Sequence, residues 1–331
     1  MRNSVITTVE GSFASYVADL KPTPSERAQA SQSQLHVRDV LTRAASRGDI
    51  PKLLGTEFLT GSYARFTKPH PLDDVDLIVP MNGAGLVPTS GGTTVGTVEG
   101  TWTWDSPILG TAYDDQTGNK SSIKVLTAFQ RVLDAAYEGS TVVRDGQAIN
   151  VWLASYGLGL DIVPAFHIQP FWGRDYYYIP RGHNLPNWMP TNPKLDQELL
   201  DAQCSEWGHE RLREVIVLLK RWNQQLAQKL KPYHLEVLIR NHFRYRALIS
   251  YSGAAQSFLC EAASLIEASC PDLTGLGSNL DDYLSAAQRS AIAAAAREHG
   301  DSATMALFFE QRGEVNAALS CWGRVFGEEV A

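Results

Sequence analysis

The stretch GSYARFTKPHPLDDVDLIV, residues 61 to 79, sets two carboxylates into a run of strand-forming residues. Because alternate side chains of a strand share a face, Asp74 and Asp76 are expected to point one way and the intervening Val75 the other. The two carboxylates then lie about 6.6 Å apart along the backbone and can converge on one or two hard cations. The alternative is an exposed edge strand whose polar face is solvated.

Two neighbouring features favour the cation site. Gly61 and Ser62 stand where they can open a helix, whose N–H groups and hydroxyl can hold phosphate oxygens. Downstream, in YGLGLDIVPAF, Asp161 shares a strand face with Gly157 and Gly159, and two missing side chains beside a carboxylate leave room for a ligand. We therefore expect the side chains at positions 74, 76 and 161 to meet at a single point.

The composition bounds the class of protein. A chain of 331 residues is longer than one core usually organises, so two subdomains are expected, and the apolar content of 44% supports a sizeable core. Lys and Arg total 29 against 36 for Asp and Glu, giving a net charge of -7. This balance argues against a protein that coats long nucleic acid through a basic face, but a small anionic ligand carried with a metal fits it.

Neither end of the chain nor its cysteines suggest export. The start, MRNSVITTVEGSFASYVADL, lacks the build of a signal peptide, and no segment approaches the apolar run of about 20 residues that spans a bilayer. A soluble, cytoplasmic protein is expected. The four cysteines have no paired spacing, which predicts buried thiols rather than disulfides or a zinc site.

The periodicity of the chain predicts strands in the first half and helices in the second. Residues 30 to 47 have helical spacing with Gly48 as the stop, VDLIVP reads as a strand, and residues 121 to 137 form an amphipathic helix. Between them, the Gly- and Thr-rich tract from 82 to about 117 reads as a surface insertion with a hairpin. Strands dominate from about 141 to 180, with a turn at Asp145-Gly146.

The second half is predicted to be a helical lobe. Asn192-Pro193 has the form of an N-cap followed by Pro at the first helical position. A helical stripe runs over residues 209 to 230, and an Ala-rich helix is expected to end at Gly300. The expected division is a core over residues 1–185, with the insertion at about 82–117, and a helical lobe over residues 186–331.

Taken together, these motifs resemble a known family. GSYARFT followed by DDVDLIV and a later strand with a third Asp is similar to the nucleotidyltransferase superfamily with the DNA polymerase β-like fold. WMPTNPK at 188 to 194, LLKRWN at 218 to 223 and LKPYHLE at 230 to 236 resemble the CD-NTases, bacterial cyclic oligonucleotide synthases related to cyclic GMP-AMP synthase and oligoadenylate synthase. The resemblance spans residues 30 to 250 and implies an α+β fold, with a mixed sheet carrying the three Asp residues and a cleft beneath the helical lobe.

The resemblance implies a metal site and a reaction. Asp74 and Asp76 would bind two Mg²⁺ or Mn²⁺ ions, and Asp161 would complete the catalytic metal site and orient the attacking 3′-hydroxyl. One cation lowers the pKa of that hydroxyl, and the other neutralises the triphosphate as pyrophosphate departs. The metals would thus supply the attraction for NTP that the negative chain lacks.

The resemblance also implies nucleotide contacts. Gly61 and Ser62 would contact phosphate, Lys220 the triphosphate, Tyr233 would stack on a base, and Thr191 would lie near a base edge. Each has an ordinary alternative: Lys220 a snorkelling lysine, Tyr233 a half-buried interface residue, and the neighbouring Asn192 an N-cap. Arg65 could be structural through a carboxylate pair.

One position departs from the family pattern. Relatives commonly have Ser before the stacking Tyr, whereas Pro232 here has neither a hydroxyl nor an N–H. A second phosphate contact is therefore in doubt.

The implied function is synthesis of a cyclic di- or trinucleotide from NTPs, a second messenger for antiviral (CBASS-type) defence that acts on a separate effector protein. A flexible tail, FGEEVA, leaves room for C-terminal conjugation or a regulatory partner, although a frayed terminus is the ordinary expectation. The rivals are a linear oligonucleotide or tRNA-tailing nucleotidyltransferase and an inactive nucleotide-binding scaffold.

Overall fold

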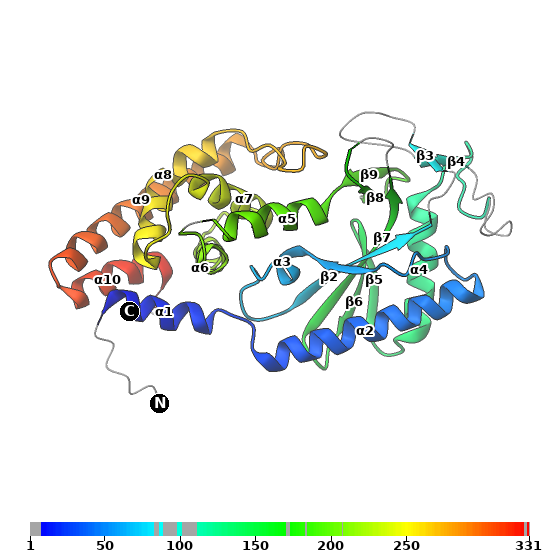
Figure 1. Cartoon of the computed structure of the whole chain (residues 1–331), viewed down its shortest axis with the longest axis horizontal. Coiled ribbons are helices and arrows are strands. Elements are labelled where there is room, and N and C mark those ends of the chain that lie inside the picture. Colours follow the sequence, from blue (N-terminus) through cyan, green and yellow to red (C-terminus); the bar gives the residue numbers. More distant parts are fainter. Residues whose placement is uncertain are drawn as a thin grey trace.

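The computed structural model describes residues 8–82, 86–88, 98–100, 111–169, 173–182, 184–206, 208–327 and 330. They form a sheet-containing lobe and a helical lobe, drawn side by side in Figure 1. The helices are α1 (Val9–Asp19), α2 (Pro24–Arg47), α3 (Gly61–Ala64), α4 (Ser122–Ala136), α5 (Pro193–Cys204), α6 (Leu212–Gln225), α7 (Pro232–Phe243), α8 (Tyr251–Glu267), α9 (Ala286–Gln311) and α10 (Val315–Phe326). The strands are β1 (Phe58–Thr60), β2 (Asp74–Met81), β3 (Leu86–Pro88), β4 (Val98–Gly100), β5 (Thr141–Asp145), β6 (Ala148–Leu153), β7 (Leu158–Ile168), β8 (Tyr176–Pro180) and β9 (Trp188–Thr191).

The main sheet is mixed, as predicted. Its order is β1-β2-β7-β6-β5, with β8 added to the second half of β7 and β9 added to β8. β2 and β7 run parallel, and the other pairs are antiparallel. β2 therefore lies inside the sheet, which rules out the solvated edge strand that its sequence also allowed.

The two faces of the sheet have different partners. Val75 and Leu77 of β2 point into a core shared with Leu41 of α2 and Phe129 of α4. The other face carries a smaller cluster that includes Ile78 of β2. Because α2 and α4 cover only one face, the opposite face is left for the helical lobe and for a ligand (Figure 1).

Helix α2 begins earlier than predicted. Thr23 and Glu26 form a capping box, in which the Thr23 side chain accepts from the Glu26 N–H and the Glu26 carboxylate accepts from the Thr23 N–H. Gly48 ends the helix with a left-handed backbone, as predicted. The predictions of a helix over 121–137, a turn after Asp145 and an N-cap at Asn192 are also confirmed.

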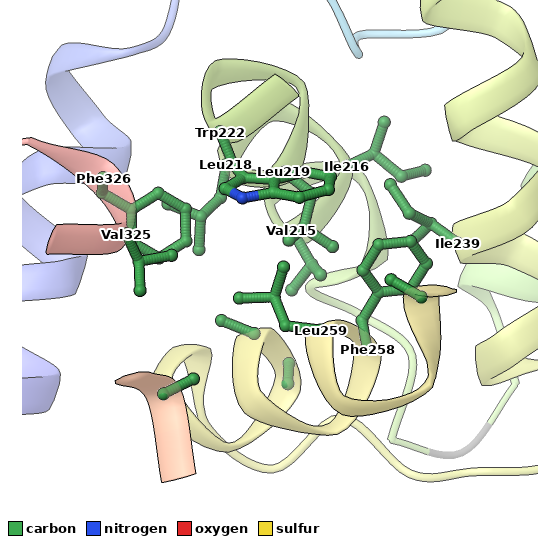
Figure 2. Close-up of a cluster of buried hydrophobic side chains, with 14 of the residues drawn as sticks. Val215, Ile216, Leu218, Leu219, Trp222, Ile239, Phe258, Leu259, Val325 and Phe326 are labelled. Atoms are coloured by element: carbon green, nitrogen blue, oxygen red, sulfur yellow. The ribbon is translucent and has the colours of Figure 1, made fainter. Parts of the chain in front are cut away.

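The helical lobe has its own core around α6. Figure 2 shows Ile216, Leu219 and Trp222 of α6 against Phe258 of α8 and Phe326 of α10. The predicted stripe is correct, but the predicted helix over 209–230 is too long. It ends at Gln225 because Leu226 adopts an extended backbone. Leu226 and Leu230 remain buried in the same core, which explains why the apolar pattern continues past the helix end.

Two elements cross the expected boundary between residues 185 and 186. β9 continues the sheet to Thr191. Helix α1 belongs to the helical lobe, where Phe13 packs edge-on against Trp322 at a centroid distance of 5.0 Å and Ser12 donates a hydrogen bond to the Val330 carbonyl at 2.6 Å. The chain thus starts in one lobe, builds the other, and returns (Figure 1).

Gly300 does not end its helix. α9 continues to Gln311, and a Cβ at position 300 would lie 3.0 Å from the Leu259 carbonyl oxygen of α8. The glycine permits close helix packing rather than a stop.

The predicted hairpin in the insertion is present as the antiparallel pair β3–β4. Trp102 and Trp104, which also suggested strands there, lie outside the described residues. None of the four cysteines forms a disulfide, and Cys204, Cys270 and Cys321 are buried as predicted, whereas Cys260 is exposed. Among the described residues, no helix combines the length and apolarity needed to cross a membrane.

Candidate active site

Asp76 and Asp161 lie side by side on the two parallel strands. The register of β2 and β7 makes them direct Cα partners, and it places Asp74 opposite Gly159. Neighbours of the two carboxylates point into the α2–α4 core, so both carboxylates share the opposite face of the sheet. The structure therefore brings together the second and third of the predicted aspartates.

The turn before β2 closes this site from one side. Thr60 of β1 is the partner of Asp76, and the chain turns at once into α3. Gly61, with φ of +68°, begins that helix as predicted, and a Cβ on it would overlap the Asp76 carboxylate. Only glycine fits there, because any side chain would collide with Asp76.

The two paired carboxylates are electrostatically costly in the absence of a bound cation. Burial raises the pKa of Asp76, and repulsion from Asp161 raises it further, while Arg65 and Lys68 act in the opposite direction. Burial likewise raises the pKa of Asp161, against a hydrogen bond of 2.7 Å from Asn150 Nδ2. A divalent cation between them would remove both the burial cost and the repulsion.

Asp74 has different surroundings. Its carboxylate, with 42% of the side chain exposed, is paired with the ammonium of Lys68, which also pairs with Asp73. In the described part of the chain, no three carboxylate, imidazole or thiol groups already form a metal cluster. The three aspartates were expected to meet at one point. In the structure, Asp76 and Asp161 form a pair, whereas the third carboxylate, that of Asp74, is held by Lys68.

These residues fit a divalent cation. Carboxylate oxygens are the ligands that Mg²⁺ and Mn²⁺ prefer, and two half-buried carboxylates on neighbouring strands supply the charge. The space expected beside Asp161 is smaller than predicted, because a Cβ at Gly159 would lie 2.9 Å from Asn150 Nδ2. Gly159 thus makes room for the amide that orients Asp161, rather than for a ligand.

A cleft of about 590 Å³ lies between the sheet and the helical lobe. Its sheet side includes Gly61, Asp76 and Thr191, and its helical side includes Tyr233. The loop between α8 and α9 completes it, contributing Asp272, Thr274, Gly277, Ser278, Asn279, Leu280, Asp282 and Tyr283. The volume is of the size that small-molecule ligands occupy.

Lys220 is held away from this cleft. Its ammonium, with 4% of the side chain exposed, pairs with Glu236 at 2.7 Å and donates to the carbonyl and hydroxyl of Thr67, each at 3.1 Å. Burial would raise the pKa of Glu236, yet the charges of Lys220 and Arg65 lower it to about 2. The contact of Lys220 with a triphosphate stays a prediction, and in this structure the lysine is a member of a buried network.

Arg65 joins the same network, as the carboxylate-pair reading predicted. Its Nε donates to Glu236 Oε1 at 2.7 Å, and its NH1 lies 3.3 Å from Asp196 Oδ2. The guanidinium also lies 5.2 Å from the centroid of the Tyr233 ring. These contacts tie the segment after α3 to α5 and α7 across the lobes, so the network fixes the position of the Gly61-Ser62 turn relative to Tyr233.

The remaining predicted contacts are located as follows. Tyr233 is partly buried against the helical core, and its ring lines the cleft, which is compatible with stacking on a base and with an interface role. Thr191 ends β9 at the cleft. Asn192 caps α5 by accepting from the Leu195 N–H at 3.0 Å, so its side chain oxygen is already used. Ser62 lies in the first turn of α3, and its contact with phosphate stays a prediction.

Sequence reasoning did not single out Lys68, Asn150 and Glu236. The sequence does carry a signal for Glu236, since it stands three residues after Tyr233 on an otherwise apolar helix face. Asn150 alternates with apolar neighbours in β6, which places it on a defined strand face. No local pattern marks Lys68.

The architecture and its cleft define the class of protein. A mixed sheet with paired aspartates, facing a helical lobe, is the polymerase β-like nucleotidyltransferase fold. No protein-family model matches the chain. A relative from Bacillus cereus (strain VD146), described as a probable cyclic nucleotide synthase, is 30% identical over 292 residues, which cover 85% of this chain and 84% of the relative.

Two solved structures have a similar fold over almost the whole chain. CdnC of E. coli MS115-1 in its complex with HORMA-deltaN has a TM-score of 0.69 at 17% identity, over 98% of this chain and 99% of that one. The CD-NTase CdnG of Bradyrhizobium diazoefficiens, solved with GTP, has a TM-score of 0.67 at 14% identity, over 97% and 96% of the two chains. The chain belongs to the CD-NTase family of cyclic nucleotide synthases and is a nucleotidyltransferase.

Proposed function

We propose that the protein joins NTPs into a cyclic di- or trinucleotide by a two-metal reaction at Asp76 and Asp161, with release of pyrophosphate. The observation that carries this proposal is the register that makes these two half-buried carboxylates neighbours, with Asp76 in the cleft wall. Their ionisation is costly in the absence of a cation, which supports a site built for one. Asp74, once free of Lys68, would supply the third carboxylate.

The residues of the chain would act in the following way. Asp76 and Asp161 would hold Mg²⁺ or Mn²⁺, which supplies a lower pKa for the attacking hydroxyl and neutralises the triphosphate. Asn150 keeps the Asp161 carboxylate in one orientation through its hydrogen bond of 2.7 Å. Gly61 leaves room for the Asp76 carboxylate against the α3 turn, so a phosphate that shares a cation with Asp76 would lie beside that turn.

The helical side of the cleft would bind the bases. The Arg65 guanidinium lies over the Tyr233 ring, 5.2 Å from its centroid. This contact would hold the ring in place for stacking on a base. Thr191 at the end of β9 would contact a base edge on the opposite wall. After one bond is made, the linear intermediate would return to the same carboxylates and close on itself.

The related structures support the choice of substrates. CdnC has been solved with ATP and CdnG with GTP, which supports NTPs as substrates here. CdnC has also been solved with a HORMA protein, which supports a regulatory protein partner for this chain. An antiviral role, in which the cyclic product activates a separate effector in the cytoplasm, is the biological part of the proposal.

The tail is less free than its composition suggests. Val330 is fully buried and its carbonyl accepts from Ser12, while Ala331 lies outside the described residues. Conjugation through Ala331 would therefore require the tail to leave this contact. Intact-mass measurement of the protein from cells expressing its neighbouring genes tests this, and an unmodified mass argues against conjugation.

A product assay tests the proposed function. Purified protein is incubated with all four NTPs and Mg²⁺ or Mn²⁺, treated with phosphatase, and the nucleotides are identified by mass. A cyclic product keeps its mass because it has no terminal phosphate, whereas a linear oligonucleotide loses its 5′-phosphates. Pyrophosphate without a cyclic mass indicates the linear rival, and pyrophosphate that appears only when tRNA is added indicates the tailing rival. Neither product nor pyrophosphate, with or without tRNA, indicates an inactive scaffold. Asp161→Ala is the matched control.

A further inference from the structure

Lys68 forms an ion pair with Asp74, the first of the three predicted metal-binding aspartates. Its ammonium pairs with the carboxylates of both Asp73 and Asp74, and only 15% of its side chain is exposed. The lysine lies in the segment that connects α3 to β2. In the described part of the chain, no lysine or arginine forms a comparable ion pair with Asp76 or Asp161.

The charge of Lys68 reaches the other two aspartates as well. It lowers the pKa of both Asp76 and Asp161, against the effect of their burial. Lys68 thus acts on both members of the pair, whereas Arg65 lowers the pKa of Asp76 alone. The same charge repels an approaching divalent cation, and the same contact occupies oxygen lone pairs on Asp74 that the cation needs.

A second cavity adjoins the Lys68 side chain. Lys68 lines this cavity of about 590 Å³ together with Tyr63, Phe66 and Val217. This cavity is lined by residues of the α1–α2 connection, of β1 and α3, and of α6, and it shares none of its lining residues with the cleft that contains Asp76. Because Glu210 and Glu214 also line this cavity, a displaced Lys68 would find carboxylates there.

We propose that Lys68 is the counter-cation of the catalytic aspartates in the nucleotide-free enzyme and must leave Asp74 before a divalent cation binds there. The inference deepens the proposed two-metal function and rests on it. Metal binding is then weak until a triphosphate arrives, because the added negative charge of the nucleotide favours the divalent cation over a single ammonium. Lys68 is a positioning residue in this scheme, since it acts through Asp74.

The test is a titration of the nucleotide-free protein with Mn²⁺. Electron paramagnetic resonance measures the concentration of free Mn²⁺ at each step and so gives the affinity. Lys68→Met is expected to bind Mn²⁺ about tenfold more tightly than the wild type, because one repelling charge and one competing contact are removed. Lys68→Arg keeps the charge and is expected to stay within about twofold of the wild type. Adding Asp161→Asn to Lys68→Met is expected to abolish the gain, which locates the ion.

Lys21→Met is the matched control. Lys21 lines the same second cavity but pairs with Glu214 at 2.5 Å, so this variant removes an equal charge without touching the aspartates. Melting curves of all variants check folding. Equal Mn²⁺ affinity in the wild type and Lys68→Met, or an equal gain in Lys21→Met, overturns the inference. If Lys68→Met binds Mn²⁺ more tightly than the wild type but the wild type makes no cyclic product, the proposed function is wrong while the inference about Lys68 stands.

Discussion

The Cα of Gly61 packs directly against the carboxylate of Asp76. The two residues are linked through β1, because Thr60 is the sheet partner of Asp76 and the chain turns into α3 one residue later. The turn that would receive phosphate and the carboxylate that would hold a cation are therefore one rigid unit.

Gly61→Ala tests whether the contact between Gly61 and the Asp76 carboxylate matters for activity, apart from the backbone strain that any residue with a side chain has at a positive φ. The added methyl is expected to displace the Asp76 carboxylate and lower activity about 100-fold, in line with the effect of small misplacements of reacting groups. Gly55→Ala is the control, because Gly55 also has φ of +68° but nothing within 4 Å of an added Cβ. Initial rates of pyrophosphate release measure both variants, and equal activity in the two would contradict the geometry.

Removing the charge of Asp76 is expected to stabilise the protein. The pKa values of Asp76 and Asp161 are raised above the ordinary 3.8. In the folded protein their ionisation thus costs stability as pH rises above that value, and the cost persists at neutral pH. Asp76→Asn is expected to raise the melting temperature by about 2 °C at pH 7 while abolishing activity. A lower melting temperature without metal would show that the carboxylate is already compensated.

Glu236 is expected to be the most sensitive position of the buried network. Glu236→Ala leaves Lys220 buried without its carboxylate and leaves Arg65 with Asp196 alone, and breaking a buried pair in this way typically costs about 3–5 kcal/mol. Because folding lowers the pKa of Glu236 from 4.5 to about 2, its contribution is fully present above pH 4.5 and is lost as pH falls towards 2. Urea denaturation at several pH values measures both effects.

Lys220→Met distinguishes the two roles open to that lysine. If Lys220 only neutralises Glu236, the variant loses stability while the KM for NTP stays unchanged in the folded fraction. If it also reaches a triphosphate, the KM rises as well. The double variant Lys220→Met with Glu236→Gln removes the Lys220–Glu236 pair but leaves Arg65 with Asp196 as its carboxylate partner. It is therefore expected to recover only part of the lost stability, and not a lost nucleotide contact.

Gly300→Ala tests the close packing of α8 and α9. Alanine is a better helix former by about 1 kcal/mol, yet the Cβ would lie 3.0 Å from the Leu259 carbonyl oxygen. We expect a net loss of about 1–2 kcal/mol in unfolding free energy. Asp301→Ala, at an exposed position one residue along, serves as the control and is expected to stay within about 0.5 kcal/mol of the wild type.

The sheet positions of the site were predictable because they follow from period-two alternation. Asp76 and Asp161 stand among residues such as Leu77 and Ile162 whose burial defines the face, so both orientations could be read from sequence. The register that makes them partners could not, since it depends on a parallel pairing between strands about 85 residues apart. The family resemblance supplied that link.

The charged contacts were harder to predict for a related reason. Lys220 is a plausible phosphate ligand by its motif, but its partner Glu236 is on another helix and Thr67 is 153 residues away. Gly300 was misread as a stop because a glycine that allows helix packing and one that ends a helix look alike in sequence. In both cases the deciding atom belongs to a distant part of the chain.

Helix α1 packs its apolar face on α10, through Phe13 against Trp322 and Phe326. During synthesis on a ribosome, Phe13 therefore emerges more than 300 residues before Trp322 and Phe326, the two rings that it packs against. The sheet lobe can assemble in the meantime, whereas this face of α1 stays uncovered, exposed or held by a chaperone, until α10 has emerged. A nascent chain stalled before α10 should therefore leave α1 open to proteases.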